Sequence, residues 1–285
     1  MPQVSVVVPT CGRPALLMRC LQALESQSLP REQYEVIVIE DHQRDGPATA
    51  RNRGWKRARA PVVAFTDDDC IADRDWLRRG LQALADADAV CGRIVMPLNG
   101  APTDYERDAQ GLERAEFVTA NCFVRKEMLE RVGGFDERFR LAWREDSDLH
   151  FGLLAQGARI EREPHAIVVH PVRPAGWGVS LGQQRKVMFD ALLFKKYPRL
   201  YRERIRAAPR WDYYLIVASL IAGPLWPPAW LIWFLMTSAF CWRRLRGTSW
   251  APRHVLEMVL TSIAIPPVAV FWRLVGALRF KVAFI

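Results

Sequence analysis

The stretch GPATARNRGWKRARAPVVAFTDDDC, residues 46–70, decides the fold. Its first part has helical spacing over residues 48–58, and its second part predicts a buried strand over residues 62–66 that runs into three aspartates, residues 67–69. Adjacent carboxylates repel one another unless a cation lies between them. Mg²⁺ and Mn²⁺ prefer carboxylate oxygens and also bind phosphates. The stretch therefore predicts either a metal-bridged diphosphate site or a solvated acidic turn.

Strands and helices alternate on both sides of this stretch. Apolar runs predict further strands over residues 4–8, 35–39, 89–96, 117–124 and 166–170. Helical spacing predicts helices over residues 14–25, 75–85, 126–132 and about 145–157. The polar region 97–116 is expected to be a surface loop. The alternation predicts an α/β fold with a mostly parallel sheet flanked by helices, in which ligands bind beyond the carboxyl ends of the strands.

Residues at or near other strand ends are candidates for binding. Asp41 ends the second strand, where it either accepts hydrogen bonds from a base or ribose or serves as a turn residue. Arg51 and Arg53 offer guanidinium groups to a phosphate, or belong to a solvated helix face. His170 ends the last strand and is either a further metal ligand or a strand-end histidine with a structural partner.

A second acidic cluster contains Glu145, Asp146 and Asp148. A carboxylate held near a metal site can take a proton from a hydroxyl group, while the metal stabilises a leaving diphosphate. The two clusters therefore fit a division of labour between metal binding and base catalysis. The alternative role of the second cluster is to cap the helix that follows it.

In this order and at this spacing, the motifs resemble glycosyltransferase family 2, with its GT-A nucleotide-sugar-binding fold. The resemblance covers about residues 3–172. It rests on VSVVVPT at residues 4–10, IED at 39–41, the stretch 46–70, GGFDE at 133–137 and EDSDL at 145–149.

The resemblance implies an inverting transfer of a sugar from a nucleotide-sugar donor, with Mg²⁺ or Mn²⁺ as the cofactor. It implies Asp67 and Asp69 as the D-x-D metal ligands, and Asp146 as the catalytic base with Glu145 as a lesser candidate. His170, from its place at a strand end, is the further expected metal ligand. The expected donor-binding residues are Pro9, Thr10, Asp41, Arg51, Arg53, Asp67 and Asp68.

Two departures from the family pattern bear on substrate. EDHQRD at residues 40–45 replaces the D-D-G-S-T-D of the family, which leaves the nucleotide base open. Gln184-Arg185-Lys186 lacks the tryptophan of the Q-x-x-R-W motif of processive members, which favours transfer of a single sugar. A processive polysaccharide synthase and a non-catalytic sugar-nucleotide-binding scaffold subunit remain the alternatives.

The C-terminal third differs in composition from the rest. Residues 180–206 have a helical pattern and are strongly basic, and residues 213–242 contain no acid and no base. That stretch is long enough to cross a bilayer, but its prolines also allow a re-entrant course. A second apolar segment covers residues 255–272, and basic residues flank both segments. The pattern predicts C-terminal basic helices and a hydrophobic, membrane-associated helical hairpin.

The expected domains are a GT-A-like domain over residues 1–178, a basic amphipathic helical linker over 179–212 and a membrane-associated region over 213–285. A formal net charge of +9 favours anionic partners, and no nucleic-acid-binding motif is present. We expect a lipid-linked or glycan acceptor at the cell membrane. The N-terminus is typical of a strand and not of a signal peptide, so the catalytic domain is expected to face the cytoplasm.

Overall fold

The computed structural model describes residues 1–284 and divides the chain into two compact units. The first unit contains residues 1–97 and 110–172, and the second contains residues 98–109 and the chain from Arg173 onward. The chain therefore passes between the units three times. The sequence pattern places residues 98–109 in the N-terminal domain, whereas the structure packs them with the C-terminal helices.

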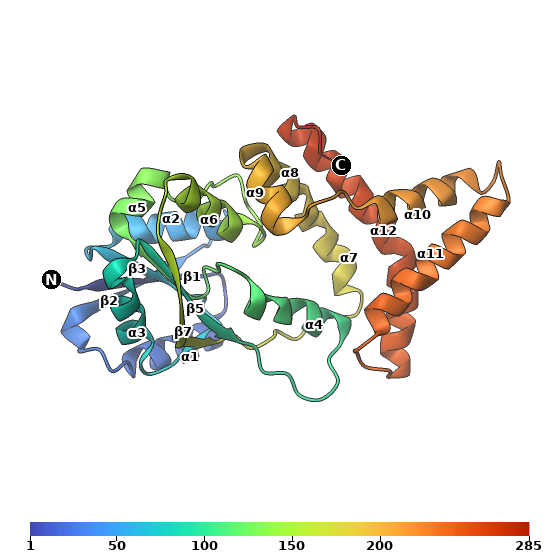
Figure 1. Ribbon diagram of the computed structural model, residues 1–285. Helices are drawn as coiled ribbons and strands as arrows, with labels where there is room; N and C mark the ends of the chain where they lie inside the picture. The colour runs from blue at the N-terminus through green and yellow to red at the C-terminus, as the bar shows by residue number, and fades with distance from the viewer. Residues whose placement is uncertain (285) are drawn as a thin grey trace. The chain divides into compact units, whose positions relative to one another are not determined.

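A seven-stranded sheet forms the centre of the first unit. Its strands are β1 (Val4–Thr10), β2 (Tyr34–Glu40), β3 (Val62–Phe65), β4 (Ile71–Ala72), β5 (Ala89–Val95), β6 (Cys122–Arg125) and β7 (Ile160–Val169), in the order β2-β1-β3-β6-β5-β7-β4. Its helices are α1 (Pro14–Glu25), α2 (Pro47–Arg57), α3 (Trp76–Ala83), α5 (Lys126–Val132) and α6 (Glu145–Ala155). Helices α2, α5 and α6 lie on one side of the sheet, and α1 and α3 lie on the other (Figure 1).

The sheet has parallel ladders, as expected, but it also contains antiparallel strands. β1 runs parallel to β2 and β3, but β6 runs antiparallel to both β3 and β5. The chain leaves β5 and returns to β6 at the same end of the sheet, so β6 has to run in the opposite direction.

Two glycines let α2 lie close to the sheet. Gly46 precedes the helix with φ at +106°, and a Cβ there would lie 2.5 Å from the carbonyl oxygen of Arg140. A Cβ on Gly54 would overlap the side chain of Val7 in β1. Because only glycine fits at both places, the helix that carries Arg51 is held against the buried strand β1.

The second unit is helical. Its helices are α4 (Asp104–Gln110), α7 (Val179–Gln183), α8 (Met188–Lys196), α9 (Pro198–Leu200), α10 (Trp211–Ala222), α11 (Pro228–Leu245) and α12 (Pro252–Phe280). The predicted loop 97–116 thus contains α4, and the predicted apolar segment 213–242 is two helices instead of one. The break falls at residues 223–227, where glycine and prolines interrupt the helical hydrogen bonds.

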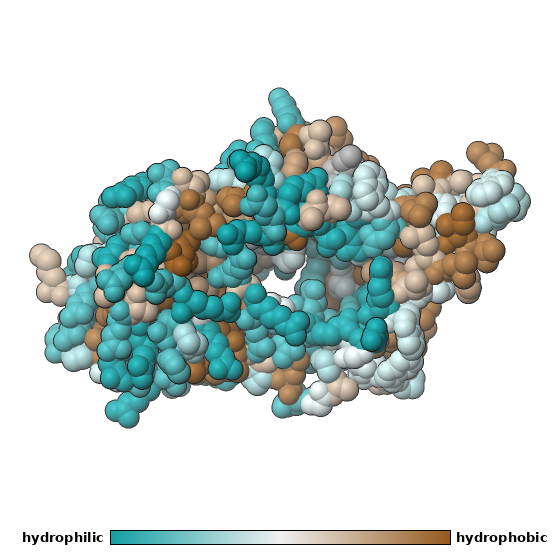
Figure 2. Space-filling view, viewed as in Figure 1, coloured by the Kyte–Doolittle hydropathy of each residue, from teal (hydrophilic) through white to brown (hydrophobic). Residues whose placement is uncertain are grey.

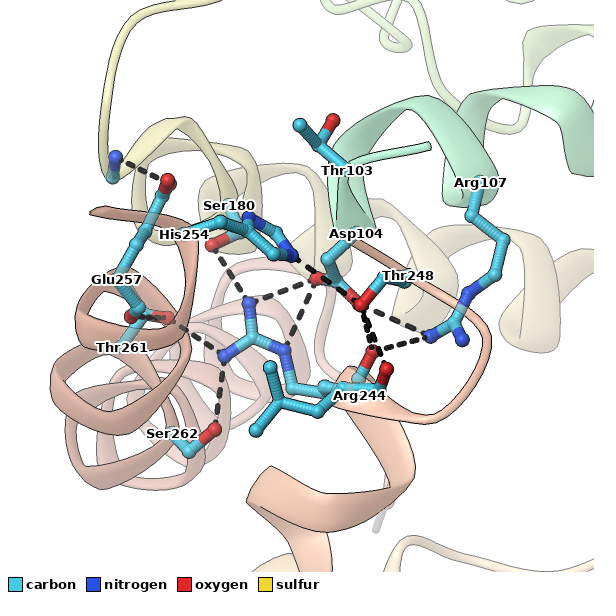
Figure 3. Close-up of polar contacts among 12 residues, drawn as sticks. Thr103, Asp104, Arg107, Ser180, Arg244, Thr248, His254, Glu257, Thr261 and Ser262 are labelled. Atoms are coloured by element: carbon cyan, nitrogen blue, oxygen red, sulfur yellow. Dashed lines mark hydrogen bonds and ion pairs between the residues drawn. The ribbon is translucent and has the colours of Figure 1, made fainter. Parts of the chain in front are cut away.

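Buried Arg244 connects three helices of this unit (Figure 3). Its Nη2 lies 2.8 Å from Asp104 Oδ2 in α4, and its Nη1 donates to Thr261 Oγ1 at 2.7 Å and Ser262 Oγ at 3.0 Å in α12. Arg107 of α4 donates to the carbonyl oxygen of Arg244 at 3.0 Å. Segment 98–109 is therefore fastened to α11 and α12 by charged and polar side chains.

Within residues 1–284, α12 is the one helix whose length and composition would allow it to cross a bilayer. Its mean hydropathy reaches 1.8 over 18 residues, and 39% of that window is buried inside the protein. The shorter α10 is also apolar.

Candidate active site

The three predicted metal ligands meet beyond the ends of two strands. Asp67 and Asp69 follow β3, and His170 follows β7. β4 pairs with the last two residues of β7, which holds the loop after β3 beside His170. His170 Nε2 lies 3.9 Å from Asp67 Oδ2 and 3.7 Å from Asp69 Oδ1. The fold therefore brings together side chains that lie about a hundred residues apart in the sequence.

The donor set at this point fits a hard divalent cation. Ligand atoms of Asp69, Cys70 and His170 all lie within 4.8 Å of one another. Burial and the neighbouring aspartates raise the pKa of the Cys70 thiol well above its ordinary value, so the protonated thiol is a poor ligand. Two carboxylates and an imidazole remain, and carboxylate oxygens are what Mg²⁺ and Mn²⁺ prefer.

Asp68, between the two predicted ligands, faces the protein interior. Its side chain is fully buried; it accepts a hydrogen bond from Thr10 Oγ1 at 2.7 Å and lies 3.0 Å from Arg13 Nη2. Burial raises the pKa of Asp68, and the Thr10 and Arg13 contacts oppose that rise. The sequence pattern placed Asp68 at the donor, whereas the structure uses it to join the loop after β1 to the loop after β3.

Arg51 links the two acidic clusters. Its side chain is only 4% exposed; its Nη2 donates to Asp67 Oδ1 at 2.8 Å and its Nη1 to Glu145 Oε1 at 3.3 Å. A guanidinium group in this position neutralises carboxylates that would otherwise repel one another. The expectation that Arg51 faces a ligand phosphate does not match this burial, whereas Arg53 is half exposed and pairs with Asp45.

Glu145 and Asp146 open helix α6, next to Arg51. Burial raises the pKa of Glu145 to about 8, with a further contribution from Asp146 and an opposing one from Arg51. Burial also raises the pKa of the partly exposed Asp146, although Arg51 and a 2.6 Å hydrogen bond from Thr119 Oγ1 oppose the rise. Carboxylates with raised pKa values accept protons more readily than ordinary ones, which is the property that a general base needs.

Asp41 shapes the loop between β2 and α2. Its Oδ1 and Oδ2 accept hydrogen bonds from the backbone N–H groups of Asp45 and Gly46, both at 2.9 Å. Its own N–H donates to the carbonyl oxygen of Thr10, also at 2.9 Å. Pro9, Thr10 and Asp41 are therefore neighbours at the carboxyl ends of the paired strands β1 and β2.

The family model described as Glycosyl transferase family 2 matches residues 39–135, from the end of β2 to the GGF turn. This match covers about a third of the chain and supports a family 2 glycosyltransferase. The matched residues include Arg51 and the three aspartates, but they end before Glu145 and Asp146.

The curated relatives of this chain are glycosyltransferases. Glycosyltransferase AglE of Haloferax volcanii is 25% identical over 240 residues, which cover 69% of this chain and 78% of that protein. Pre-mycofactocin glycosyltransferase of Mycobacterium tuberculosis is 32% identical over 167 residues, or 53% of this chain and 35% of that protein. The chain thus spans most of the first relative and about a third of the second. These matches confirm the predicted family and enzyme class.

Solved structures confirm the GT-A-like fold. The mannosyltransferase PcManGT of Pyrobaculum calidifontis, in complex with GDP-Man and Mn²⁺, has a TM-score of 0.60 at 20% identity, covering 96% of this chain and 87% of that one. S. aureus TarS 1–349, in complex with UDP, has a TM-score of 0.51 at 17% identity, covering 96% and 92%.

The sequence analysis missed Asn52, although it lies between Arg51 and Arg53, two of the candidate residues. Its side-chain amide donates to the carbonyl oxygen of Phe135 and accepts from the N–H of Phe135, both at 2.9 Å. Its Nδ2 also reaches Glu137 Oε1 at 2.9 Å. The order ARNRG then GGFDE contained this pairing, but only the fold shows that the two motifs meet.

Proposed function

We propose that this protein is a metal-dependent, inverting glycosyltransferase that moves a sugar from a nucleoside-diphosphate sugar to a lipid-linked or glycan acceptor at a membrane surface. The observation that carries the proposal is the link through Arg51. It places the carboxylate cluster of Asp67 within one side chain of the carboxylates that open α6. A single guanidinium group thus fixes the position of the proposed metal site relative to the helix end that carries the proposed base.

Asp67, Asp69 and His170 would hold the Mg²⁺ or Mn²⁺ ion. When bound, such an ion stabilises the negative charge that develops on a departing diphosphate. The mannosyltransferase with the similar fold carries Mn²⁺ with its GDP-Man, which supports this assignment for the present chain.

Asp146 is the proposed base. The acceptor oxygen attacks the anomeric carbon, the bond from that carbon to the diphosphate breaks, and the hydroxyl proton passes to the Asp146 carboxylate. Asp146 is partly exposed and is oriented by Thr119, whereas Glu145 is buried against Arg51. The structure therefore favours Asp146 over Glu145 for contact with the acceptor.

Four residues form the proposed donor site. Pro9, Thr10 and Asp41 are largely buried and shape the ends of β1 and β2, and half-exposed Arg53 offers a guanidinium group to a phosphate. The complexes of similar folds with UDP and with GDP-Man support a nucleotide in this region of the fold. We assign Arg51 and Asp68 to positioning these loops and acids and not to donor contact.

Measuring release of nucleoside diphosphate tests this proposal. The purified protein is given a panel of nucleotide sugars with membrane lipid extract, in Mn²⁺, in Mg²⁺ and in EDTA. We expect release with one donor, loss in EDTA, and a fall of about 10²–10⁴-fold in Asp146→Asn. Exposed Asp86→Asn is the matched control and should keep its rate. Equal rates in the two variants, or full activity in EDTA, would contradict the proposal.

A further inference from the structure

Large apolar side chains are exposed almost exclusively in the second unit. Among residues 1–284, Met1 and Met18 are the only exposed large apolar residues of the first unit, and the others lie beyond residue 172. They lie on the α10–α11 hairpin and along α12, and Figure 2 shows brown patches on the hairpin. Contiguous apolar surface of this kind marks an interaction site.

The hairpin has a charged base and an apolar tip. Asp212, at the start of α10, lies 2.9 Å from Arg210 Nη2 and 3.2 Å from Arg243 Nη2 near the end of α11. No acid or base occurs in residues 213–242 between these ends. At the tip, Leu225 is 91% exposed. Exposed Trp226 lies beside it, and Leu231, Phe234 and Leu235 extend the exposed apolar surface along α11.

The base of the hairpin is packed, but its tip is not. Tyr213 and Ile216 of α10 and Phe240 of α11 form one buried cluster with Ile265 and Ala269 of α12. The hairpin is therefore fixed at its charged end by protein contacts. Packing within the second unit gives no reason for the exposed apolar side chains at the tip.

Helix α12 is long enough to cross a bilayer, but segment 178–196, which contains charged residues, packs along its length. Glu257 Oε1 accepts from the N–H of Gly178 at 2.7 Å near one end, and Lys195 Nζ donates to the carbonyl oxygen of Phe280 at 2.8 Å at the other. A Cβ on Gly276 would lie 2.5 Å from the carbonyl oxygen of Met188. Segment 178–196 therefore follows α12 from end to end.

Segment 178–196 cannot accompany α12 through hydrocarbon without a large cost. It contains Arg185, Lys186, Asp190, Lys195 and Lys196. Asp190 and Arg273 of α12 are both buried, 3.7 Å apart. Charged side chains and irregular backbone facing lipid tails cost several kcal/mol each. The contacts along α12 thus favour a helix that lies in the membrane interface.

We propose that the second unit docks on one leaflet of an anionic lipid bilayer, with the α10–α11 tip inserted and no segment crossing. The 12 residues of α10 reach about 18 Å, well short of the ~30 Å hydrocarbon core. Both outer ends of the hairpin are tied together, so the chain enters and leaves from the same side.

The excess of basic residues indicates that an anionic lipid bilayer binds this surface. The second unit, residues 98–109 and 173–285, contains eighteen Lys and Arg against seven Asp and Glu. Basic residues beside an amphipathic apolar surface are attracted to anionic headgroups. A second copy of this chain would bring the same positive charge to the contact and is disfavoured by repulsion.

Flotation with lipid vesicles tests the docking surface without donor or acceptor, so its result is independent of the proposed enzyme activity. We expect the protein to float with vesicles of phosphatidylcholine and phosphatidylglycerol, more weakly with phosphatidylcholine alone, and more weakly in high salt. The pair Leu225→Ser and Trp226→Ser should reduce the bound fraction at least about tenfold. Exposed Met18→Ser in the first unit is the control and should float normally. Failure of the unaltered protein to float, or a salt-stable dimer that the tip substitutions dissociate, would overturn the proposal.

Labelling tests whether α12 crosses. Arg253→Cys and Arg279→Cys place thiols at the two exposed ends of α12, with the unaltered chain as the background reference. On sealed vesicles, an impermeant maleimide should label both positions equally before and after lysis. Labelling of one end only after lysis would show that the helix spans the bilayer and would overturn docking on one leaflet.

Discussion

Arg51 is the residue on which the two acidic clusters depend. Removing its charge leaves Asp67 and buried Glu145 without their shared partner. We expect Arg51→Met to lower the free energy of unfolding by about 3–5 kcal/mol, since one member of a buried ion pair is lost. Chemical denaturation in EDTA measures this. Half-exposed Arg53→Met, two residues away, is the control and should change stability little. Equal losses of stability in the two variants would show that the buried ion pairs of Arg51 contribute no more than the exposed pair of Arg53.

Glu145 gives the metal-free protein a pH dependence. Its pKa is raised to about 8 in the folded chain, mainly by burial, from an ordinary value of 4.5. The folded state holds this proton more tightly, so its stabilising effect is complete below pH 4.5 and is lost as the pH rises through about 8. The melting temperature in EDTA should therefore fall more between pH 5 and pH 8 in the unaltered protein than in Glu145→Gln. Parallel curves for the two proteins would contradict the raised pKa.

At the residue scale, the sequence predicted proximity better than orientation. The rule that ligands gather beyond strand ends correctly placed Asp67, Asp69 and His170 together. It gave no information on which way a side chain points. Arg51 and Asp68 were therefore expected at the ligand, although the fold buries both among protein partners.

Among the elements, the junction of α2 with the GGFDE turn offers a matched pair of glycines. Gly133 and Gly134 both have positive φ, at 79° and 72°. A Cβ on Gly133 meets nothing within 4 Å, whereas one on Gly134 would lie 2.6 Å from Asn52 Oδ1. We expect Gly133→Ala to cost about 1–2 kcal/mol from backbone strain, and Gly134→Ala to cost clearly more because the Asn52 hydrogen bonds are disturbed as well. Urea denaturation of both variants decides this, and equal costs would contradict it.

Elements with strong local patterns were predicted well, and those set by distant contacts were not. The strand at residues 62–66 and the helix at 126–132 match β3 and α5 closely, because apolar runs and flanking glycines define them. Helix α4 is polar and was taken for loop, since Arg244, its main partner, lies 140 residues further along the chain. The antiparallel direction of β6 likewise depends on the end of the sheet at which the connection from β5 to β6, residues 96–121, rejoins it.

For the whole molecule, segment 98–109 belongs to the second unit although both its ends continue into the first, and a truncation tests this division. Arg107 is held by the carbonyl oxygen of Arg244, so removal of residues 173–285 should free the bond after Arg107 for cleavage. We expect trypsin to cut there much faster in the truncated chain than in the full one, as followed by mass spectrometry. Arg125, whose side chain bonds the carbonyl oxygens of Leu84 and Ala87 in the first unit, serves as the internal control. Equal cutting after Arg107 in both chains would show that segment 98–109 is protected without the C-terminal helices.

The contact between Asp104 and Arg244 also sets an order of events on the ribosome. The two residues are 140 positions apart. At about 5–20 residues per second, α4 emerges roughly 7–30 s before its partner. For that interval the nascent chain holds an acidic segment whose basic counterpart has not yet been synthesised. The translation speed through the intervening codons therefore sets how long segment 98–109 remains without its contact to Arg244.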